Sequence, residues 1–282
     1  MRNKWLAAPY VVWMALFVVA PLILVVIFAF TGQDGSITLD NFSNMGTYIP
    51  AFQHSFALAF IATLICILIG YPLAYFLSRE GVMVRKVAMM LIMLPMWMNF
   101  LLRTYAWMSI LDDNGLINQF LSAIGFFDLW NAIFGTNLQF FHMINTPGAI
   151  VLGMVYNFLP FMVLPIFSVI EKIDPKVVEA AQDLGANSSM VFRKVIFPLS
   201  LPGVLSGVTM VFIPSVSTFA LSRLLGGGKT LLLGDLIEMQ FLGNAYNPHL
   251  GSAIALVMMV IVLVLMAIMN RFGEGEEGVA VL

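Results

Sequence analysis

Charged side chains are scarce in this chain, and their scarcity limits what the protein can be. Lysine and arginine number 13 and aspartate and glutamate 15, so charged residues make up 10% of the 282. Soluble domains carry about 25% charged residues. With 61% hydrophobic residues, this chain has more apolar surface than one core can bury, which excludes a soluble globule and predicts an integral membrane protein. The formal net charge of -2 is too small to indicate nucleic acid as a partner.

Cysteine and histidine are also few. Cys66 is the only cysteine, which excludes an internal disulfide, and its apolar surroundings predict a small packed side chain. His54, His142 and His249 are scattered along the chain, without the paired spacing of metal ligands. These residue types therefore predict no metal site, no cofactor and no catalytic centre.

The stretch "GGGKT" at 226–230 invites comparison with a nucleotide-binding loop. A P-loop needs a glycine five residues before the glycine of its Gly-Lys pair, and Arg223 occupies that position. No strand is predicted before it. The chain is therefore not expected to bind a nucleotide.

Long apolar runs take the place of the missing charge. A bilayer core of about 30 Å needs about 20 apolar residues per helix. The first run, from Trp5 to Phe30, is too long for the core of a signal peptide and is predicted to be a retained helix. The fold class expected is an all-α membrane protein with six transmembrane helices in one domain, over the segments 7–30, 56–78, 87–111, 149–170, 200–221 and 251–270.

Lysine and arginine lie mostly on one side of these spans. With the N-terminus inside, ten of them fall in cytoplasmic segments and three elsewhere, a strong positive-inside bias. Both termini and the segment 171–199 are therefore predicted to be cytoplasmic. The ten are Arg2, Lys4, Arg79, Arg85, Lys86, Lys172, Lys176, Arg193, Lys194 and Arg271, and the three are Arg103, Arg223 and Lys229.

Two long connections, 112–148 and 222–250, are expected on the outer side. Gly115 and Gly125 bracket an apolar-periodic piece that is predicted to be a short helix in the interface. These connections either cap the helix bundle or form a docking surface. The outer acids could attract a cationic cargo or be solvated loop charges; they are Asp112, Asp113, Asp235 and Glu238.

The most polar continuous stretch, 174–203, predicts a short helix–turn–helix. Asp174 is a suitable N-cap, Pro175 suits the first helical position, and Gly185 can end the helix in the left-handed conformation. A second helix, "SMVFRKVIF", is expected to end at Pro198. An amphipathic connector on lipid headgroups is one interpretation, but two carboxylates and small alanines fit a groove in a partner protein better. An apolar stripe of Val177, Val178, Ala181 and Leu184 lies beside acidic Glu179 and Asp183.

"EAAQDLGANSSMVFRKVIFPLSLPG" resembles the EAA loop of ABC importer permeases, which reads E-A-A, three residues, Gly, nine residues, then I-x-L-P. Val195 and Phe197 stand where that pattern has Ile and Leu, a conservative departure. In the family this loop is a coupling helix that docks into a cleft of the ATPase subunit. The residues to which the resemblance assigns that coupling role are Glu179, Ala180, Ala181, Asp183, Gly185 and Pro198.

The resemblance extends over nearly the whole chain to permease subunits of spermidine/putrescine importers, through "LIGYPLAYFLSR", "LPMWMNFLLRTYAW", "VYNFLPFMVLP" and "SRLLGGGK". It implies a type I importer architecture in the cell membrane and alternating access without covalent chemistry. The partners it implies are an ABC ATPase dimer, a second homologous permease subunit and an extracytoplasmic substrate-binding protein. An importer of another small solute, an ion-coupled secondary transporter and a membrane scaffold are the alternatives.

Few polar groups are available inside the spans. Arg103 is the only charge within one, roughly 24 Å along a straight helix from Val87, and is predicted to snorkel to the outer surface beside Tyr105. A role in the pore is the alternative. Asn157 lies near the midplane, where an amide serves a pathway or joins two helices. The candidate pathway residues are Tyr156, Asn157, Ser215 and Thr218.

Overall fold

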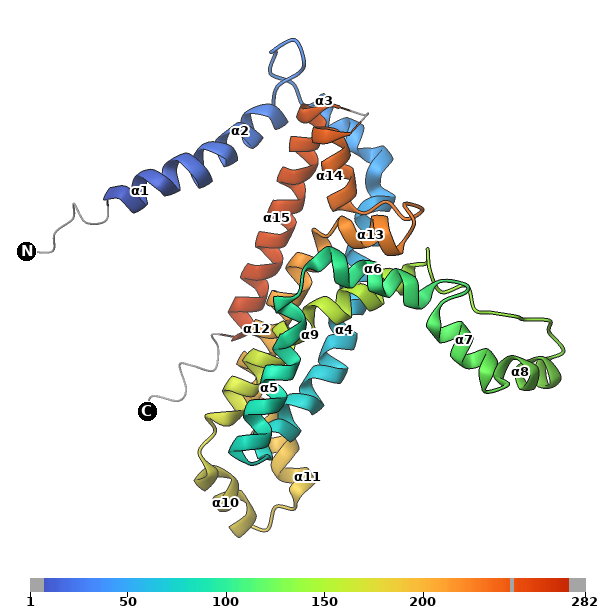
Figure 1. Ribbon diagram of the computed structural model, residues 1–282. Coiled ribbons are helices and arrows are strands. Elements are labelled where there is room, and N and C mark those ends of the chain that lie inside the picture. Colours follow the sequence, from blue (N-terminus) through green and yellow to red (C-terminus); the bar gives the residue numbers. More distant parts are fainter. Residues whose placement is uncertain (1–7, 244–245, 274–282) are drawn as a thin grey trace, which may run out of the picture.

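Helices make up the regular structure of the chain, and the longest of them follow its apolar runs. A computed structural model describes residues 8–243 and 246–273 (Figure 1). The elements are α1 (Ala8–Met14), η2 (Ala15–Val19), α2 (Ala20–Ala29), α3 (Asp40–Ser43), η3 (Asn44–Tyr48), α4 (Ile49–Arg79), α5 (Val82–Trp97), α6 (Phe100–Leu111), α7 (Leu116–Ala123), α8 (Phe126–Phe134), α9 (Pro147–Glu171), α10 (Pro175–Asp183), α11 (Ser188–Val191), η4 (Phe192–Ile196), α12 (Phe197–Val216), α13 (Ala220–Leu225), α14 (Leu233–Leu242) and α15 (Pro248–Gly273).

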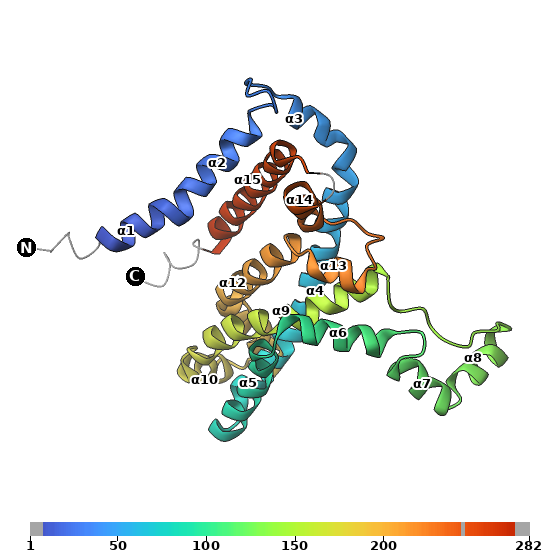
Figure 2. The same cartoon turned by 45° about the horizontal axis from the view of Figure 1, so that its top comes forward.

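Three long helices, α4, α9 and α12, pack against one another at the centre of the molecule (Figures 1 and 2). Gly70 of α4 and Gly207 of α12 both face Met162 of α9, whose side chain is fully buried. Between apolar helices in lipid, small residues allow the close approach from which packing energy comes. Cys66 is buried in the same core, as predicted from its apolar surroundings.

The first helical run lies at the periphery. Its second part, α2, packs against α15, and its first part, α1, lies farther from the bundle (Figure 1). None of its most apolar window is buried inside the protein, and that window has a mean hydropathy of 3.0. Apolar side chains that face outward along a whole helix are the surface that hydrocarbon covers in a membrane protein.

Among the described residues, five helical runs are long and apolar enough to cross a membrane, and a bent pair makes a sixth if it is counted as one span. The bent pair replaces the straight span predicted over 87–111. The chain turns by 95° between α5 and α6. Pro95 removes a backbone donor near the end of α5, and Asn99 starts a new helix by accepting hydrogen bonds from the N–H groups of Leu101 and Leu102.

The short helices α7 and α8 form an arm that extends sideways from the bundle (Figure 2). Helix α7 lies between Gly115 and Gly125, where the sequence predicts it. Gly125 has a φ of 72°, in the left-handed region that glycine enters without strain, and it turns the chain into α8. Phe120 and Ile133 are exposed on this arm, so it presents apolar surface to its surroundings.

Candidate functional site

Helix α10 stands at one end of the bundle and is closed at both ends by local hydrogen bonds (Figure 1). The Asp174 carboxylate accepts from the backbone N–H of Lys176 at 2.9 Å. At the other end Gly185 has a φ of +85°, and its N–H donates to the Gln182 carbonyl at 2.8 Å. The Ala186 N–H donates to the Ala181 carbonyl at 3.0 Å, which completes a Schellman motif. Both predicted helix ends are confirmed.

The second helix of this segment does not end where the sequence predicts. Asn187 caps α11 by accepting from the N–H of Met190 at 2.8 Å. The chain then passes through the π-helical turn η4 directly into α12, so the prediction that Pro198 ends a helix is wrong. In the wider turn the Phe197 N–H donates to the Phe192 carbonyl five residues back. Pro198 is the second residue of α12, directly after this wider turn, which accommodates its missing N–H within the continuous helix.

Part of the apolar stripe of helix α10 is exposed. The predicted stripe divides: Val178 and Ala181 pack on the core of the bundle, whereas Val177 is 45% and Leu184 90% exposed. The acidic pair is also on the outside, since Glu179 and Asp183 are exposed. The free side of α10 thus combines an exposed apolar side chain with carboxylates around it, which matches the apolar centre and polar rim of a protein contact.

A polar groove of about 460 Å³ lies where α10 meets the ends of the long helices. Arg79 of α4 and Glu179 of α10 both line it, together with Tyr75. The Arg79 guanidinium stacks on the Tyr75 ring, 4.5 Å from its centre. The outer face of α10 and this groove define one candidate site, at the α10 end.

The prediction that Arg103 reaches the outer surface is wrong, because its side chain is buried. It is only 9% exposed, and its Nε and Nη1 atoms have no hydrogen-bond partner among the described residues. Its guanidinium carbon lies 5.8 Å from the centre of the Tyr156 ring, a cation–π arrangement. Tyr156 also packs edge-on against Trp107. The distance predicted along a straight span does not apply, because the bend before α6 turns Arg103 toward α9 instead of along the span.

The other candidate pathway residues are buried or lie at a helix break. Asn157 is 6% exposed; its Nδ2 donates to the Gly153 carbonyl of the same helix at 2.7 Å, and its Oδ1 has no partner in the described part of the chain. Ser215 is fully buried and donates to the Val211 carbonyl. Thr218 lies between α12 and α13. Within residues 8–243 and 246–273, no hydrogen bond joins any two of the four predicted residues.

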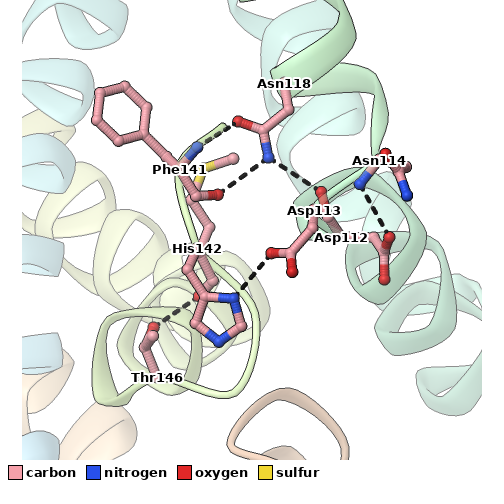
Figure 3. Close-up of polar contacts among 8 residues, drawn as sticks. Asp112, Asp113, Asn114, Asn118, Phe141, His142 and Thr146 are labelled. Atoms are coloured by element: carbon pink, nitrogen blue, oxygen red, sulfur yellow. Dashed lines mark hydrogen bonds and ion pairs between the residues drawn. The ribbon is translucent and has the colours of Figure 1, made fainter. Parts of the chain in front are cut away.

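Two of the outer acids bind within the arm and its base. Asp113 Oδ1 lies 2.8 Å from His142 Nδ1, and Asp112 accepts from the backbone N–H of Asn114 (Figure 3). Close by, the Asn118 amide bonds to both backbone polar groups of Phe141 (Figure 3). These contacts fix the turn between α6 and α7 to the segment that leads into α9.

The other two outer acids are bound between α13 and α14. Asp235 is buried and accepts from the hydroxyl of Ser222 and from the backbone N–H of Leu232. Arg223 donates to Glu238 at 2.6 Å. Burial raises the pKa of Asp235 above its ordinary value, and the bond from Ser222 offsets part of that shift. All four outer acids have partners within the chain, which favours a structural role over the attraction of a cargo.

The contacts of Arg85 are not predicted from the sequence, where this residue is used only as one of the ten cytoplasmic cations that set the orientation. In the structure it pairs with Glu171 at the end of α9 and with carbonyl groups at the end of α4. The signal available in the sequence is its place four residues after Gly81, between two long apolar runs.

The described part of the chain is thus a helical bundle with five apolar spans, or six if the bent pair is one span, and a capped helix exposed at one end, which is the architecture of a multi-pass membrane protein. Residues 66–274 match the family described as binding-protein-dependent transport system inner membrane component. The chain belongs to this family, the binding-protein-dependent ABC importer permeases, and is a multi-pass membrane protein.

Two relatives show how far the likeness extends. The chain is 36% identical over 257 residues to the spermidine/putrescine transport system permease protein PotB of Escherichia coli (strain K12), which covers 88% of this chain and 90% of the relative. To PotB of Haemophilus influenzae it is 36% identical over 267 residues, covering 92% and 90%.

Solved structures support the architecture. A bacterial ABC transporter involved in the import of the acidic polysaccharide alginate superposes with a TM-score of 0.80 at 17% identity, covering 98% of this chain and 97% of that one. The MetNI methionine ABC transporter in an inward-facing conformation gives 0.56 at 17% identity, over 82% and 96%. The fold is the type I ABC importer permease fold.

Proposed function

We propose that this chain is a permease subunit of an ATP-driven importer of polyamines in the cytoplasmic membrane. The observation that carries the cargo assignment is identity of 36% over about nine-tenths of the chain to two spermidine/putrescine permeases. The chain forms one half of the translocation pore, and a second, homologous permease subunit forms the other. ATP is hydrolysed on a separate ATPase dimer, so this subunit performs no catalysis.

Helix α10 is the element that couples this subunit to the ATPase. Glu179 and Asp183 offer carboxylates, and Leu184 offers an apolar side chain that is 90% exposed, so the helix has the mixed surface that a cleft in a partner would bury. Ala180 and Ala181 keep the helix narrow. Gly185 and the capped turn after it fix the angle at which α10 leaves the bundle. Pro198 contributes to the start of α12 and not to the docking face.

The α10 end is the cytoplasmic end of the bundle, and both termini lie on that side. This orientation follows from the bias of lysine and arginine. The α7–α8 arm and the α13–α14 region then lie outside, where an extracytoplasmic binding protein delivers the cargo.

Cargo passes this subunit without being held tightly. Tyr156 on α9 and Thr218 after the end of α12, both partly exposed, contribute polar surface to the path, and the buried Asn157 and Ser215 lie within its walls. The cationic Arg103 beside Tyr156 repels a polyamine. In the described part of the chain, the outer carboxylates of Asp113 and Glu238 are paired with His142 and Arg223, so they are not free to bind the cargo. High-affinity selection therefore belongs to the binding protein.

Uptake of radiolabelled spermidine and putrescine tests the proposal. Cells that lack this subunit are expected to lose uptake and to regain it with the wild-type chain. A substitution that inactivates ATP hydrolysis in the partner ATPase should abolish that uptake. Uptake that survives this substitution and collapses with the proton gradient would indicate an ion-coupled transporter instead. Normal polyamine uptake in the deletion strain, with loss of another solute, would reassign the cargo within the family.

A further inference from the structure

We propose that Arg85 is a positioning residue that fastens the base of the coupling helix to the ends of α4 and α5, so that movement of α10 is transmitted into the bundle. The inference rests on the proposed docking role of α10 and specifies how the docked helix acts on the spans.

One guanidinium joins three helices at the α10 end. Arg85 belongs to the first turn of α5, and its Nη1 donates to Glu171 Oε1, the last residue of α9, at 2.5 Å. Its Nη2 donates to the carbonyl oxygens of Ser78 at 3.3 Å and Glu80 at 3.2 Å, where α4 ends. The guanidinium is a planar fork of N–H donors, which allows one side chain to bind a carboxylate and two carbonyl groups together.

The position of Glu171 makes this contact relevant to α10. Only three residues separate Glu171 from Pro175, where α10 begins. Two of them are wound tightly, since the N–H of Lys172 donates to the Val169 carbonyl and the N–H of Ile173 to the Ile170 carbonyl. A short, hydrogen-bonded connection of this kind does not absorb a displacement. A force on α10 therefore reaches Glu171, and through Arg85 it reaches α4 and α5.

Helix α5 carries the displacement onward. Met89 and Ile92, in the middle of α5, pack against the core shared by α4, α9 and α12, which ties this part of the helix to the bundle. At its other end α5 meets the 95° bend, beyond which α6 brings Arg103 over the Tyr156 ring. Arg85 thus stands at the start of a continuous path from the docking helix to the candidate pathway residues.

The same contacts contribute little to folding. The side chains of Arg85 and Glu171 are 25% and 44% exposed, and partly solvated ion pairs add little to stability. Loss of the pair is therefore expected to change the coupling of ATP hydrolysis to transport and to leave assembly of the complex unchanged.

The experiment uses the complete transporter in proteoliposomes and counts spermidine molecules imported per ATP hydrolysed. Arg85→Gln and Glu171→Gln are each expected to lower that ratio by roughly 2- to 30-fold, the range of substitutions along coupling networks. Arg85→Lys keeps the charge without the fork and should resemble Arg85→Gln. The exchange Arg85→Glu with Glu171→Arg should recover part of the ratio. Lys86→Gln, at the exposed neighbouring position, is the matched control and should leave it unchanged.

A second measurement does not depend on the cargo. Spin labels at Lys176 on α10 and Val82 on α5, with Cys66 replaced by alanine, report the distance between the two helices. In wild type this distance should stay constant through the ATP cycle, because the helices move together. In Arg85→Gln it should change on addition of ATP. A constant distance in Arg85→Gln, or an unchanged import ratio, would overturn the proposal.

Failure of the docking assignment is recognised separately. Leu184→Asp places a charge at the exposed C-terminal end of α10 and leaves Arg85 and its partners unchanged. This substitution should release the ATPase in a pull-down. If the ATPase stays bound and fully stimulated in Leu184→Asp, the docking role of α10 is wrong, whatever Arg85→Gln does to the distance between α10 and α5.

Discussion

Gly203 of α12 lies so close to Pro165 of α9 that a Cβ atom built on it would stand 2.8 Å from the Pro165 carbonyl oxygen. Gly207, four residues further along α12, faces Met162 of α9. A Cβ atom built on Gly207 would lie 3.2 Å from the Met162 carbonyl oxygen. The two glycines form a small-xxx-small pattern on one face of α12. Contact between two central spans therefore depends on the absence of side chains at these positions.

Gly203→Val should separate α9 from α12 and destabilise the protein. Added volume in a packed interface typically costs about 1–3 kcal/mol, and here the obstacle is backbone, which does not rotate away. The thermal unfolding midpoint of the detergent-purified protein measures the effect. Gly81→Ala is the matched control, because a Cβ at Gly81 meets no atom within 4 Å. An equal midpoint for Gly203→Val and wild type would show that the helices do not pack as described.

Asn157→Leu should lower transport without loss of assembly. The Asn157 amide bonds only within its own helix and leaves Oδ1 unpaired, so a leucine removes a buried acceptor and disrupts no contact between helices. With the proposed pathway role of Asn157, loss of one hydrogen bond to the cargo should reduce the uptake rate by roughly 2- to 10-fold. Thr209→Val, where the hydroxyl also bonds to its own helix, is the control. Normal uptake across a substrate titration would make Asn157 a structural residue.

The parts of the fold that the sequence predicts are those set by neighbouring residues. Asp174, Pro175 and Gly185 delimit α10 because capping requires side chains and conformations at fixed offsets from a helix end. Hydropathy likewise locates the spans, because each must bury about 20 residues in lipid whatever its neighbours are. Neither inference needs knowledge of which helices touch.

The differences come from tertiary context. Pro198 is a strong stop signal in isolation, yet the π-helical turn before it carries the hydrogen bonds past the missing donor. Arg103 looks like a snorkelling residue until the bend after Trp97 points it toward Tyr156. Pro95 and Asn99 are present in the sequence as signals for that bend, but proline is tolerated in straight spans too. The burial of Asp235 depends on α13, which contributes Ser222.

Accessible cysteines should establish the orientation. With Cys66 replaced, Ser36→Cys and Ser122→Cys should react with an impermeant thiol reagent in intact cells. Both positions are exposed, Ser36 between α2 and α3 and Ser122 in α7, and these elements lie away from α10 (Figure 1). Ser188→Cys, exposed in the segment after α10, should react only after permeabilisation. The prediction follows from the lysine and arginine bias. Labelling of Ser188→Cys in intact cells would reverse the orientation and remove α10 from reach of a cytoplasmic ATPase.

Asp235 should make stability depend on pH. Burial raises its pKa in the folded protein above the ordinary value of about 3.9, so the folded chain holds a proton that the unfolded chain releases. Stability is then highest below the ordinary pKa and falls as pH rises toward the raised one. Asp235→Asn should remove this decline in unfolding midpoints measured from acid to neutral pH. Asp128→Asn, on the exposed side of α8, should retain it. An identical pH profile for wild type and Asp235→Asn would contradict the assignment.

Gly185→Val should uncouple transport from ATP hydrolysis, whereas Gly185→Asn should be tolerated. Gly185 has a φ of +85°, and a Cβ there meets no atom within 4 Å, so any effect of substitution comes from backbone conformation alone. Valine is strongly disfavoured at positive φ, at a cost of about 1–3 kcal/mol, but asparagine adopts that region more readily. The strain falls on the turn after α10 and not on the spans, so Gly185→Val should still insert in the membrane.

In Gly185→Val the strained turn should change the angle of α10, so that Glu179 and Leu184 no longer fit the ATPase. The measurement pairs an ATPase pull-down with substrate-stimulated ATP hydrolysis in reconstituted membranes. Stimulation should be lost in Gly185→Val and kept in Gly185→Asn, a difference that simple removal of glycine does not explain. If Gly185→Val expresses well, retains the ATPase and shows full stimulation, the turn at Gly185 is not part of the coupling element. If both variants fail alike, the position requires glycine for contact with the partner, since the chain itself leaves room for a side chain there.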